Sequence, residues 1–237
     1  MTGTDPQPYL DLVDWRRRVG DLYRITGPDA VMRFRGARDE LFRTHPQSPI
    51  EPEERDSFTG LRYFDTDPAC RVTAHVEPGD DTELVIDTGG EDGAVRYRRV
   101  GRLVFTLAGQ ECRLTVLSLV QYAGGLFVPF RDRTSGRETY GGGRYLFDTA
   151  KDTDGLVLEI KPGSSEVVLD FNYAYNASCA YSPRWACPLA PPENHLQVDV
   201  SAGEKTYKDQ RRLEPPPEPS PRRDGDMMSL RRLLRLR

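Results

Sequence analysis

The pattern of hydrophobic and polar positions changes once along the chain, from a helical period to alternation. In the first part, apolar side chains recur at steps of three and four, as one face of a helix requires: Leu12, Trp15, Val19, Leu22 and Tyr23, then Phe34, Ala37, Leu41 and Phe42. Pro28 and Asp29 separate the two runs, and these residue types favour the start of a second helix. Residues 1–57 are therefore predicted to form an N-terminal helical segment.

The alternating part begins near residue 61 and consists of short stretches separated by turns such as Pro78-Gly79-Asp80. Such alternation is typical of strands with one buried face. The predicted strands cover residues 71–77, 82–87, 95–100, 103–107, 111–120, 126–131, 144–147, 156–160, 166–171 and 196–200. Since no helical pattern lies between them, the predicted fold class is mainly β (α+β). Residues 58–208 are expected to form an antiparallel β-barrel or sandwich of about nine or ten short strands, with the helices packed on it.

The last part of the chain, residues 209–237, matches neither pattern. It opens with a proline-rich run, Leu213-Glu-Pro-Pro-Pro-Glu-Pro-Ser-Pro221, which cannot form a packed core and is expected to be extended or disordered. It ends in Met227-Met-Ser-Leu-Arg-Arg-Leu-Leu-Arg-Leu-Arg237, and residues 221–237 hold six Arg and two Asp. A short basic amphipathic helix could contact a membrane surface or an acidic partner, and a frayed tail is the alternative.

Composition narrows the class of protein. The 237 residues carry a formal net charge of −4, with 37% hydrophobic and 30% charged residues, as expected of a soluble globular chain. The negative balance argues against nucleic acid as the main partner, because phosphate binding normally needs a basic excess. The first residues lack the basic start and apolar run of a signal peptide, and no stretch approaches the roughly 18 apolar residues of a membrane span. A cytoplasmic location is therefore expected.

Residues 127–196 are crowded with unusual side chains, beginning with three consecutive glycines between Tyr140 and Arg144. The glycines lack the Gly-x-Gly-x-x-Gly spacing of a dinucleotide site and the Lys-Ser/Thr of a phosphate loop. Two interpretations stay open. A ligand could press against bare backbone N–H groups, with Arg144 as an anion clamp, or the glycines could form a bulge at a tight barrel corner.

A second loop in this region, residues 172–195, is rich in Asn, Tyr and Pro. Asn and Tyr side chains can hold such a loop through hydrogen bonds, and its prolines make it rigid. A fixed loop of this type is either a structural plug or the wall of a pocket. The predicted ligand-binding residues of the two loops are Arg131, Tyr140, Gly141, Gly142, Gly143, Arg144, Asn172, Tyr175, Asn176, Tyr181 and Asn194.

Two cysteines of the second loop, Cys179 and Cys187, are separated by seven intervening residues, and seven more separate Cys187 from His195. This spacing matches none of the short zinc knuckles, so no metal site is predicted. The open alternatives are a thiol nucleophile assisted by His195, a redox-active or structural disulfide, and a pair of buried apolar residues. Cys179, Cys187, Glu193 and His195 are the candidate catalytic residues.

Long motifs in these loops carry a resemblance to a known family. They read Phe130-Arg-Asp-Arg-Thr-Ser-Gly-Arg-Glu-Thr-Tyr-Gly-Gly-Gly-Arg-Tyr-Leu146, Val168-Leu-Asp-Phe-Asn-Tyr-Ala-Tyr-Asn176 and Cys179-Ala-Tyr-Ser-Pro-Arg-Trp-Ala-Cys-Pro-Leu-Ala-Pro-Pro-Glu-Asn194. With His45-Pro-Gln-Ser-Pro49 and Phe58-Thr-Gly-Leu-Arg-Tyr-Phe64, they make roughly residues 30–205 similar to the bacterial and archaeal domain of unknown function 1684, DUF1684. The resemblance implies a cytoplasmic single-domain protein and supplies no established activity, cofactor or catalytic residue.

Three hypotheses about function follow. In the first, a small anionic molecule is bound in a pocket between the loops 131–145 and 172–195. In the second, the protein is an enzyme that uses thiol or acid–base chemistry of Cys179, Cys187, Glu193 or His195. In the third, it is a structural or protein-interaction domain without a ligand. A bound flavin is a further hypothesis, because small β-barrels can hold one, although no motif encodes it.

Overall fold

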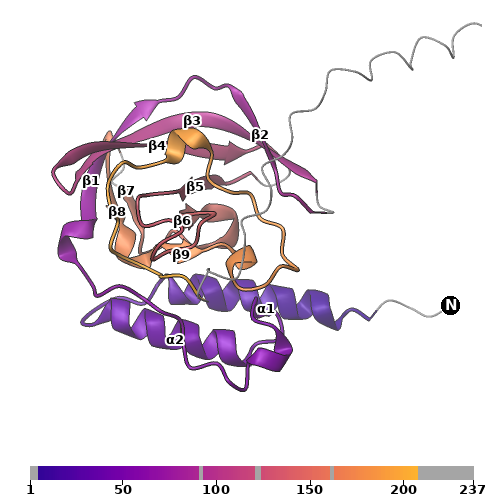
Figure 1. Ribbon diagram of the computed structural model, residues 1–237. Coiled ribbons are helices and arrows are strands. Elements are labelled where there is room, and N and C mark those ends of the chain that lie inside the picture. Colours follow the sequence, from indigo (N-terminus) through magenta and orange to yellow (C-terminus); the bar gives the residue numbers. More distant parts are fainter. Residues whose placement is uncertain (1–4, 91–92, 121–123, 161–162, 208–237) are drawn as a thin grey trace, which may run out of the picture.

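The computed structural model describes residues 5–90, 93–120, 124–160 and 163–207. Two helices, α1 (Gln7–Leu22) and α2 (Ala30–Thr44), lie next to each other along one side of a strongly curved sheet (Figure 1). The fold is α+β, and its antiparallel sheet curls into a half-barrel. The predicted fold class, with N-terminal helices packed on an antiparallel β structure, is therefore confirmed.

Among the described residues the sheet has nine strands: β1 (Arg71–Pro78), β2 (Glu83–Asp87), β3 (Ala94–Leu107), β4 (Gln110–Leu119), β5 (Leu126–Phe130), β6 (Arg144–Asp148), β7 (Leu158–Ile160), β8 (Glu166–Asp170) and β9 (Tyr175–Asn176). They pair in the order β7-β8-β1-β3-β4-β5-β6-β9, with β2 added on β3. Each of these pairings is antiparallel. The half-barrel therefore has open edges at β7 and β9.

The structure corrects the predicted strands in three places. The stretches 95–100 and 103–107 are one strand, because a register shift between Arg99 and Gly101 bends β3 without ending it. Residues 196–200 do not form a strand, although Leu196, Val198 and Val200 are all buried. Single backbone hydrogen bonds connect them to the first loop instead. The short strand β9 was not predicted.

One hydrophobic core is shared by the sheet and the helices. Tyr23 at the end of α1 packs edge-on against Phe34 of α2, with ring centroids 4.9 Å apart, and Phe34 packs against Tyr173 at 5.0 Å. Within the half-barrel, Phe171 packs against Phe130 at 5.4 Å, and both rings are fully buried. Burial of one such ring stabilises a fold by about 1.5–3 kcal/mol. These core contacts hold the loop after β8 in place.

A second, smaller cluster ties the loop 177–195 to the helices. Its buried members are Phe42, Ile50, Phe58, Leu61 and Tyr181. The ring of Tyr181 lies 5.3 Å from Phe42 and 5.5 Å from Tyr207, the last described residue. The predictions for residues 209–237 lie outside the described residues. None of the helices in the described ranges is long and apolar enough to cross a membrane.

Candidate functional site

The two loops singled out in the sequence lie against each other. The backbone N–H of Arg131 donates to the carbonyl of Asn194 at 2.9 Å, and the N–H of Leu196 donates to the carbonyl of Arg131 at 2.8 Å. Asn194 itself is fully buried and ties the second loop to the sheet. Its Oδ1 accepts from the N–H of Thr115 at 2.7 Å, while its Nδ2 donates to the carbonyls of Thr115 and Pro129. The loops therefore form one rigid unit with β4 and β5.

Replacing Asn194 with alanine is expected to lower the free energy of unfolding by about 1–3 kcal/mol. The substitution leaves buried backbone groups of Thr115 and Pro129 without partners, and such groups cost about that much. Urea unfolding of the two proteins measures the difference. Gln197→Ala, at an exposed amide two residues past His195, is the matched control and should change little. Equal losses for both variants would contradict the anchoring role of Asn194.

The glycine triplet packs against the protein itself. A Cβ on Gly142 would lie 2.5 Å from the Tyr140 ring and 3.1 Å from Leu189 of the second loop. Gly143 has φ +92°, and a Cβ there would lie 2.5 Å from the carbonyl oxygen of Phe130. Both positions therefore require glycine so that the first loop can turn tightly and approach its neighbours. This geometry matches the second of the two interpretations, a tight corner beside β5.

The guanidinium of Arg144, the predicted anion clamp, lies inside the protein. Its side chain and that of Asp132 are both 0% exposed, and Nη2 donates to the Asp132 carboxylate at 2.8 Å. The same guanidinium donates to the backbone carbonyls of Val200, Ala202 and Glu204. The positive charge of Arg144 is thus compensated by an internal carboxylate, and its donors join β6 to the last described segment.

A second buried network surrounds Glu204, which sequence reasoning missed. Its carboxylate is 1% exposed and accepts from Arg38 of α2 at 2.8 Å. It also accepts from the Tyr181 hydroxyl and from the Asn176 side chain at 3.0 Å. Two predicted ligand-binding residues therefore direct donors at this carboxylate: Tyr181 its hydroxyl and Asn176 its side-chain N–H, while Oδ1 of Asn176 is buried without a partner among the described residues. In the sequence, Glu204 stands between polar residues and carries no signal of burial.

Two further predicted ligand-binding residues also have partners within the chain. The amide of Asn172 bonds to the backbone N–H and carbonyl of Asp67, at 2.9 and 2.8 Å, and to the Asp170 carboxylate. The Tyr175 hydroxyl lies 3.0 Å from the hydroxyl of Thr153. Both side chains are buried. These contacts hold the loop after β8 against the start of β1 and the loop after β6.

Glu193 and His195 face partners other than the cysteines. Glu193 forms an ion pair with Arg99 of β3 at 2.8 Å. Burial lowers the pKa of His195, and the nearby Arg131 adds to this effect. Its Nε2 is buried without a hydrogen-bond partner among the described residues. The imidazole is therefore neutral at pH 7, beside Arg131 and within the second loop.

The thiols of Cys179 and Cys187 lie together where the two loops meet. The backbone N–H of Cys179 donates to Sγ of Cys187 at 3.4 Å, which holds the two cysteines next to each other. The Tyr140 hydroxyl, from the first loop, donates to Sγ of Cys179 at 3.6 Å. Cys187 is 9% exposed and Cys179 is half-buried. Both cysteines are free.

The local fold explains why Cys187 lies in a polarised environment. Residues Ser178–Ala180 form one turn of 3-10 helix, and the N–H groups of Ser178 and Cys179 at its start are directed at Sγ of Cys187. On the other side of Cys187, the Tyr145 hydroxyl donates to the Pro188 carbonyl at 2.7 Å and fixes the chain there. The cysteine loop is thus held at both ends.

This environment lowers the pKa of Cys187 to about 6. The largest cause is the hydrogen bond from the Cys179 thiol, and the backbone N–H groups and the Lys151 ammonium add to it against the effect of burial. The pKa of Cys179 is raised, first by its bond to Cys187 and then by burial. The directions of the two shifts favour the thiolate at Cys187 and the thiol at Cys179. A thiolate is the reactive form of cysteine toward electrophiles and disulfides.

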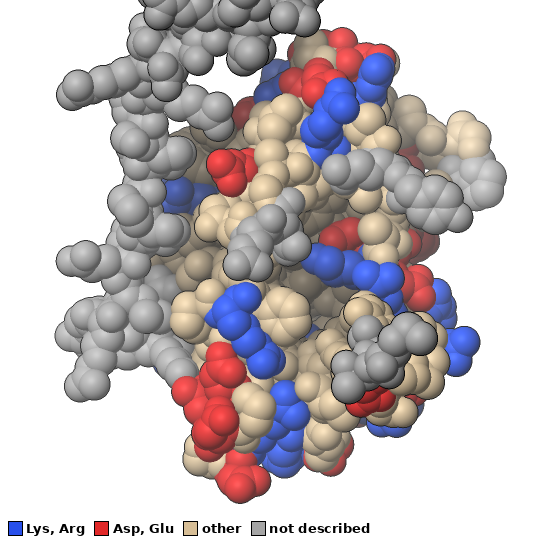
Figure 2. Space-filling view, turned by 90° about the vertical axis from the view of Figure 1, so that its right-hand side faces the viewer, with Lys and Arg blue, Asp and Glu red and all other residues tan. Residues whose placement is uncertain are grey.

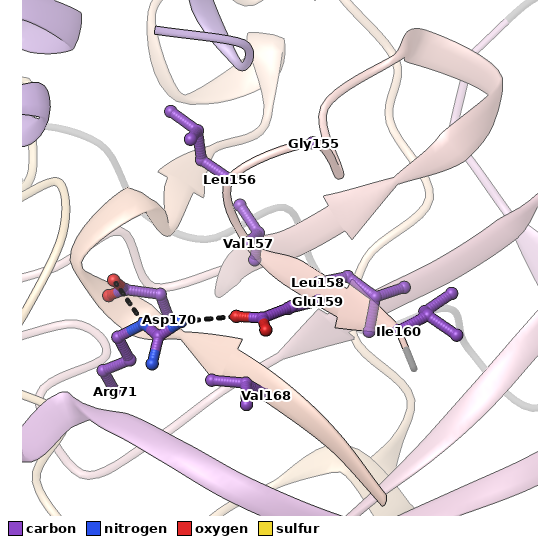
Figure 3. A pocket seen from close by; sticks show the side chains of 9 residues that line it. All are labelled: Arg71, Gly155, Leu156, Val157, Leu158, Glu159, Ile160, Val168 and Asp170. Carbon is purple, nitrogen blue, oxygen red and sulfur yellow. Dashed lines mark hydrogen bonds and ion pairs between the residues drawn. The ribbon is translucent and has the colours of Figure 1, made fainter. Parts of the chain in front are cut away.

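Two surface pockets are formed by described residues. One, of about 370 Å³, borders β7 and β8 and includes no residue of either predicted loop (Figure 3). In it Arg71 lies between Glu159, at 2.7 Å, and Asp170, at 4.0 Å, so its charge is compensated. The other, of about 210 Å³, is lined by Pro46, Gln47, Arg184 and Trp185 and so borders the second loop.

No metal centre is found in the part of the chain that the structure describes, and the face shown in Figure 2 carries charges of both signs. Within the described ranges, no group of three or more His, Cys, Asp or Glu side chains could hold a metal ion. Figure 2 shows Lys and Arg side chains interspersed with Asp and Glu on the face that lies at the right of Figure 1. That face therefore offers mixed charges to a partner.

Comparisons with known proteins agree with the motifs. The family described as "Protein of unknown function (DUF1684)" matches residues 56–205. The solution NMR structure of an uncharacterized protein from gene locus rrnAC0354 of Haloarcula marismortui is 39% identical, with a TM-score of 0.54, and the match covers 83% of this chain and 97% of that chain. No curated protein matches the chain. The chain belongs to the DUF1684 family.

Proposed function

We propose that this protein carries out thiol–disulfide exchange, with Cys187 as the nucleophile and Cys179 as the resolving thiol. The single observation that carries the proposal is the pairing of the two sulfurs in one fixed loop. Backbone N–H groups are directed at Sγ of Cys187, and the Tyr140 hydroxyl bonds to Sγ of Cys179. Backbone N–H groups stabilise a thiolate as they stabilise other anions. The substrate class is a low-molecular-weight disulfide.

The exchange balances in two steps. The Cys187 thiolate attacks one sulfur of the disulfide, whose S–S bond breaks, and the first thiolate leaves with the bonding electron pair. Cys179 then gives its proton to the solution and attacks Sγ of Cys187, which releases the second substrate thiolate. One substrate disulfide is reduced to two thiols, and the two protein thiols are oxidised to one disulfide. The reverse sequence oxidises a dithiol substrate.

The two loops would supply different parts of this chemistry. The second loop carries both sulfurs and the N–H donors of the nucleophile. The first loop supplies the Tyr140 hydroxyl, which stabilises negative charge on Cys179 as that thiol loses its proton. Gly142 lets the Tyr140 ring lie close to this site, because a Cβ would collide with the ring.

Binding of an anion at Arg144 has less support. Its guanidinium already donates hydrogen bonds to Asp132 and to three backbone carbonyls, and its side chain is 0% exposed. Glu193 also has a role outside the exchange, since it forms an ion pair with Arg99. The thiol version of the enzyme hypothesis is therefore the one that the contacts favour.

The pH dependence of alkylation tests the proposal. In the full-length protein treated with iodoacetamide, the reaction of Cys187 is expected to be half-maximal near pH 6, since its pKa is lowered to about 6 and the thiolate forms as the pH rises through it. Cys70 is the internal control, because burial raises its pKa to about 11. Peptide mapping by mass spectrometry separates the sites. Equal rates for Cys187 and Cys70 at pH 7 would contradict a thiolate at Cys187.

Matched serine variants test the exchange itself. With oxidised glutathione, the wild-type protein is expected to lose two hydrogen atoms and to form a Cys179–Cys187 disulfide. Cys179→Ser should accumulate a glutathione adduct on Cys187, while Cys187→Ser should accumulate far less adduct on Cys179. Similar adduct levels in both variants would remove the assigned roles. An absence of adduct in both, with unchanged circular dichroism, would leave the sulfurs as parts of the loop core.

A further inference from the structure

The first half of α1 exposes a stripe of large apolar side chains. Tyr9 is 65% exposed, Leu10 59% and Val13 45%, and Leu12 borders them at 36%. At 3.6 residues per turn these four positions fall on one side of the helix. Further along α1, Trp15 and Val19 pack against the cores instead. We call Tyr9, Leu10, Leu12 and Val13 the α1 stripe.

We propose that the α1 stripe binds the chain's own C-terminal segment, residues 227–237. The segment has an apolar pattern that fits such a surface, because Met227, Leu230, Leu233 and Leu234 recur at steps of three and four. A segment of about 10 residues does not form a stable helix alone in water. It does so when an apolar face is buried against a partner, as helices do in hydrophobic grooves.

The described chain ends close to this helix. The Tyr207 ring lies 5.5 Å from Tyr181, Tyr181 lies 5.3 Å from Phe42, and Phe42 lies 5.6 Å from Trp15 of α1. About 20 residues lie between Tyr207 and Met227, many of them proline. Proline-rich chains extend about 3.1 Å per residue, so this stretch would span up to about 60 Å. That is more than twice the length of a 16-residue helix at 1.5 Å per residue.

Charge fixes the direction of docking. Along α1, Asp11 comes before Arg16 and Arg17, while Arg18 is paired with Asp14 at 2.7 Å and Asp21 follows near the end of the helix. In the C-terminal region Asp224 and Asp226, which follow Arg222 and Arg223, come before Arg231, Arg232, Arg235 and Arg237. An antiparallel arrangement therefore places each acidic end against a basic end, while a parallel one opposes like charges. It also starts the segment near Arg16 and Arg17, next to Trp15, where the series of ring contacts from Tyr207 reaches α1.

Because the segment 227–237 is joined to the rest of the chain, a weak contact is sufficient for it to bind the α1 stripe. A partner joined by a chain of this length is present at an effective concentration in the millimolar range, so docking needs only a modest affinity. The apolar contacts with the α1 stripe and the charges at the ends of the helix and the segment supply this affinity, and no further part of the protein is needed. A second copy of the chain or an anionic membrane would have to compete with this attached partner, and each gives a different experimental result.

Hydrogen exchange in the full-length protein tests the proposal. The backbone amides of residues 227–236 are expected to exchange at least about tenfold more slowly in the wild-type protein than in Leu10→Ser/Val13→Ser, as measured by mass spectrometry. A tenfold factor corresponds to about 1.4 kcal/mol. The control is Val85→Ser on β2, which removes an apolar side chain that is 55% exposed and lies far from α1 in the chain. This variant should keep the slow exchange.

A charge exchange gives a second, independent test. Asp224→Lys/Asp226→Lys should accelerate exchange in the segment, and adding Arg16→Glu/Arg17→Glu to the same protein should restore the protection. Equal exchange of residues 227–236 in all variants overturns the proposal. Protection that depends on protein concentration also overturns the proposal, because it would indicate binding to a second copy of the chain, which sedimentation experiments detect. Protection that appears only with anionic phosphatidylserine vesicles would instead identify a membrane as the partner and also overturns it.

Discussion

Replacing Arg144 with methionine is expected to lower the free energy of unfolding by about 3–5 kcal/mol. The substitution leaves the Asp132 carboxylate buried at 0% exposure without its cation, and removal of one member of a buried ion pair costs about that much. It also removes the donors to the carbonyls of Val200, Ala202 and Glu204. Urea unfolding measures the loss.

Two further variants give this prediction its controls. Arg137→Met removes a guanidinium that is 65% exposed, and exposed pairs contribute about 0–1 kcal/mol. Asp132→Leu/Arg144→Met removes both charges together and is expected to be more stable than Arg144→Met alone, because no isolated charge stays buried. If Arg144→Met unfolds at the wild-type urea concentration, the pair does not hold β6 to the last described segment, and a ligand-binding role for Arg144 regains support.

Replacing Glu204 with alanine is expected to have an effect of similar size, about 3–5 kcal/mol, because it leaves Arg38 buried without its carboxylate. The hydroxyl of Tyr181 and the amide of Asn176 lose an acceptor at the same time. Cys179 lies between Asn176 and Tyr181, and Cys187 follows Tyr181 in the same loop, so alkylation of Cys187 at pH 7 should also become less selective over Cys70.

The matched control for this prediction is Glu111→Ala. Its carboxylate is 62% exposed and pairs with Arg113 on the same strand, so its loss is expected to cost about 0–1 kcal/mol. Glu204→Gln is an intermediate case, because it keeps the shape and one acceptor but removes the charge opposite Arg38. A ranking in which Glu204→Ala is no worse than Glu111→Ala would contradict the central position of this carboxylate.

Much of the fold could be predicted from local patterns of apolar and polar residues in the sequence. The period of Leu12, Trp15 and Val19 predicts α1, and alternation predicts most of the strands, because both reflect which side of an element is buried. The same alternation at Leu196, Val198 and Val200 predicted a strand that does not exist. Alternate burial requires only an extended chain on a core, whereas a strand also requires a partner with free backbone groups. The partner depends on topology, which local patterns do not contain.

The candidate site was predictable as a region and not as a set of contacts. The motif residues Arg144, Asn176 and Asn194 stood out because buried polar side chains need partners. Their partners are separated from them by 12 residues for Asp132 and by 79 for Thr115, so the sequence alone did not distinguish an internal partner from a ligand. Cys179 and Cys187 were recognised as a pair, but the N–H donors and Tyr140 that polarise them come from loop geometry.

The half-barrel has a consequence for aggregation. An open sheet presents unpaired backbone groups at its edges, and such edges can recruit strands from other molecules into fibrils. Here the edge strands are short: β7 has three residues and β9 has two. The longer side strand β2 carries acidic residues at both of its ends, Glu83 and Asp87. Short or charged edge strands of this kind limit the addition of strands from other molecules. The protein can therefore have an open half-barrel and still resist polymerisation.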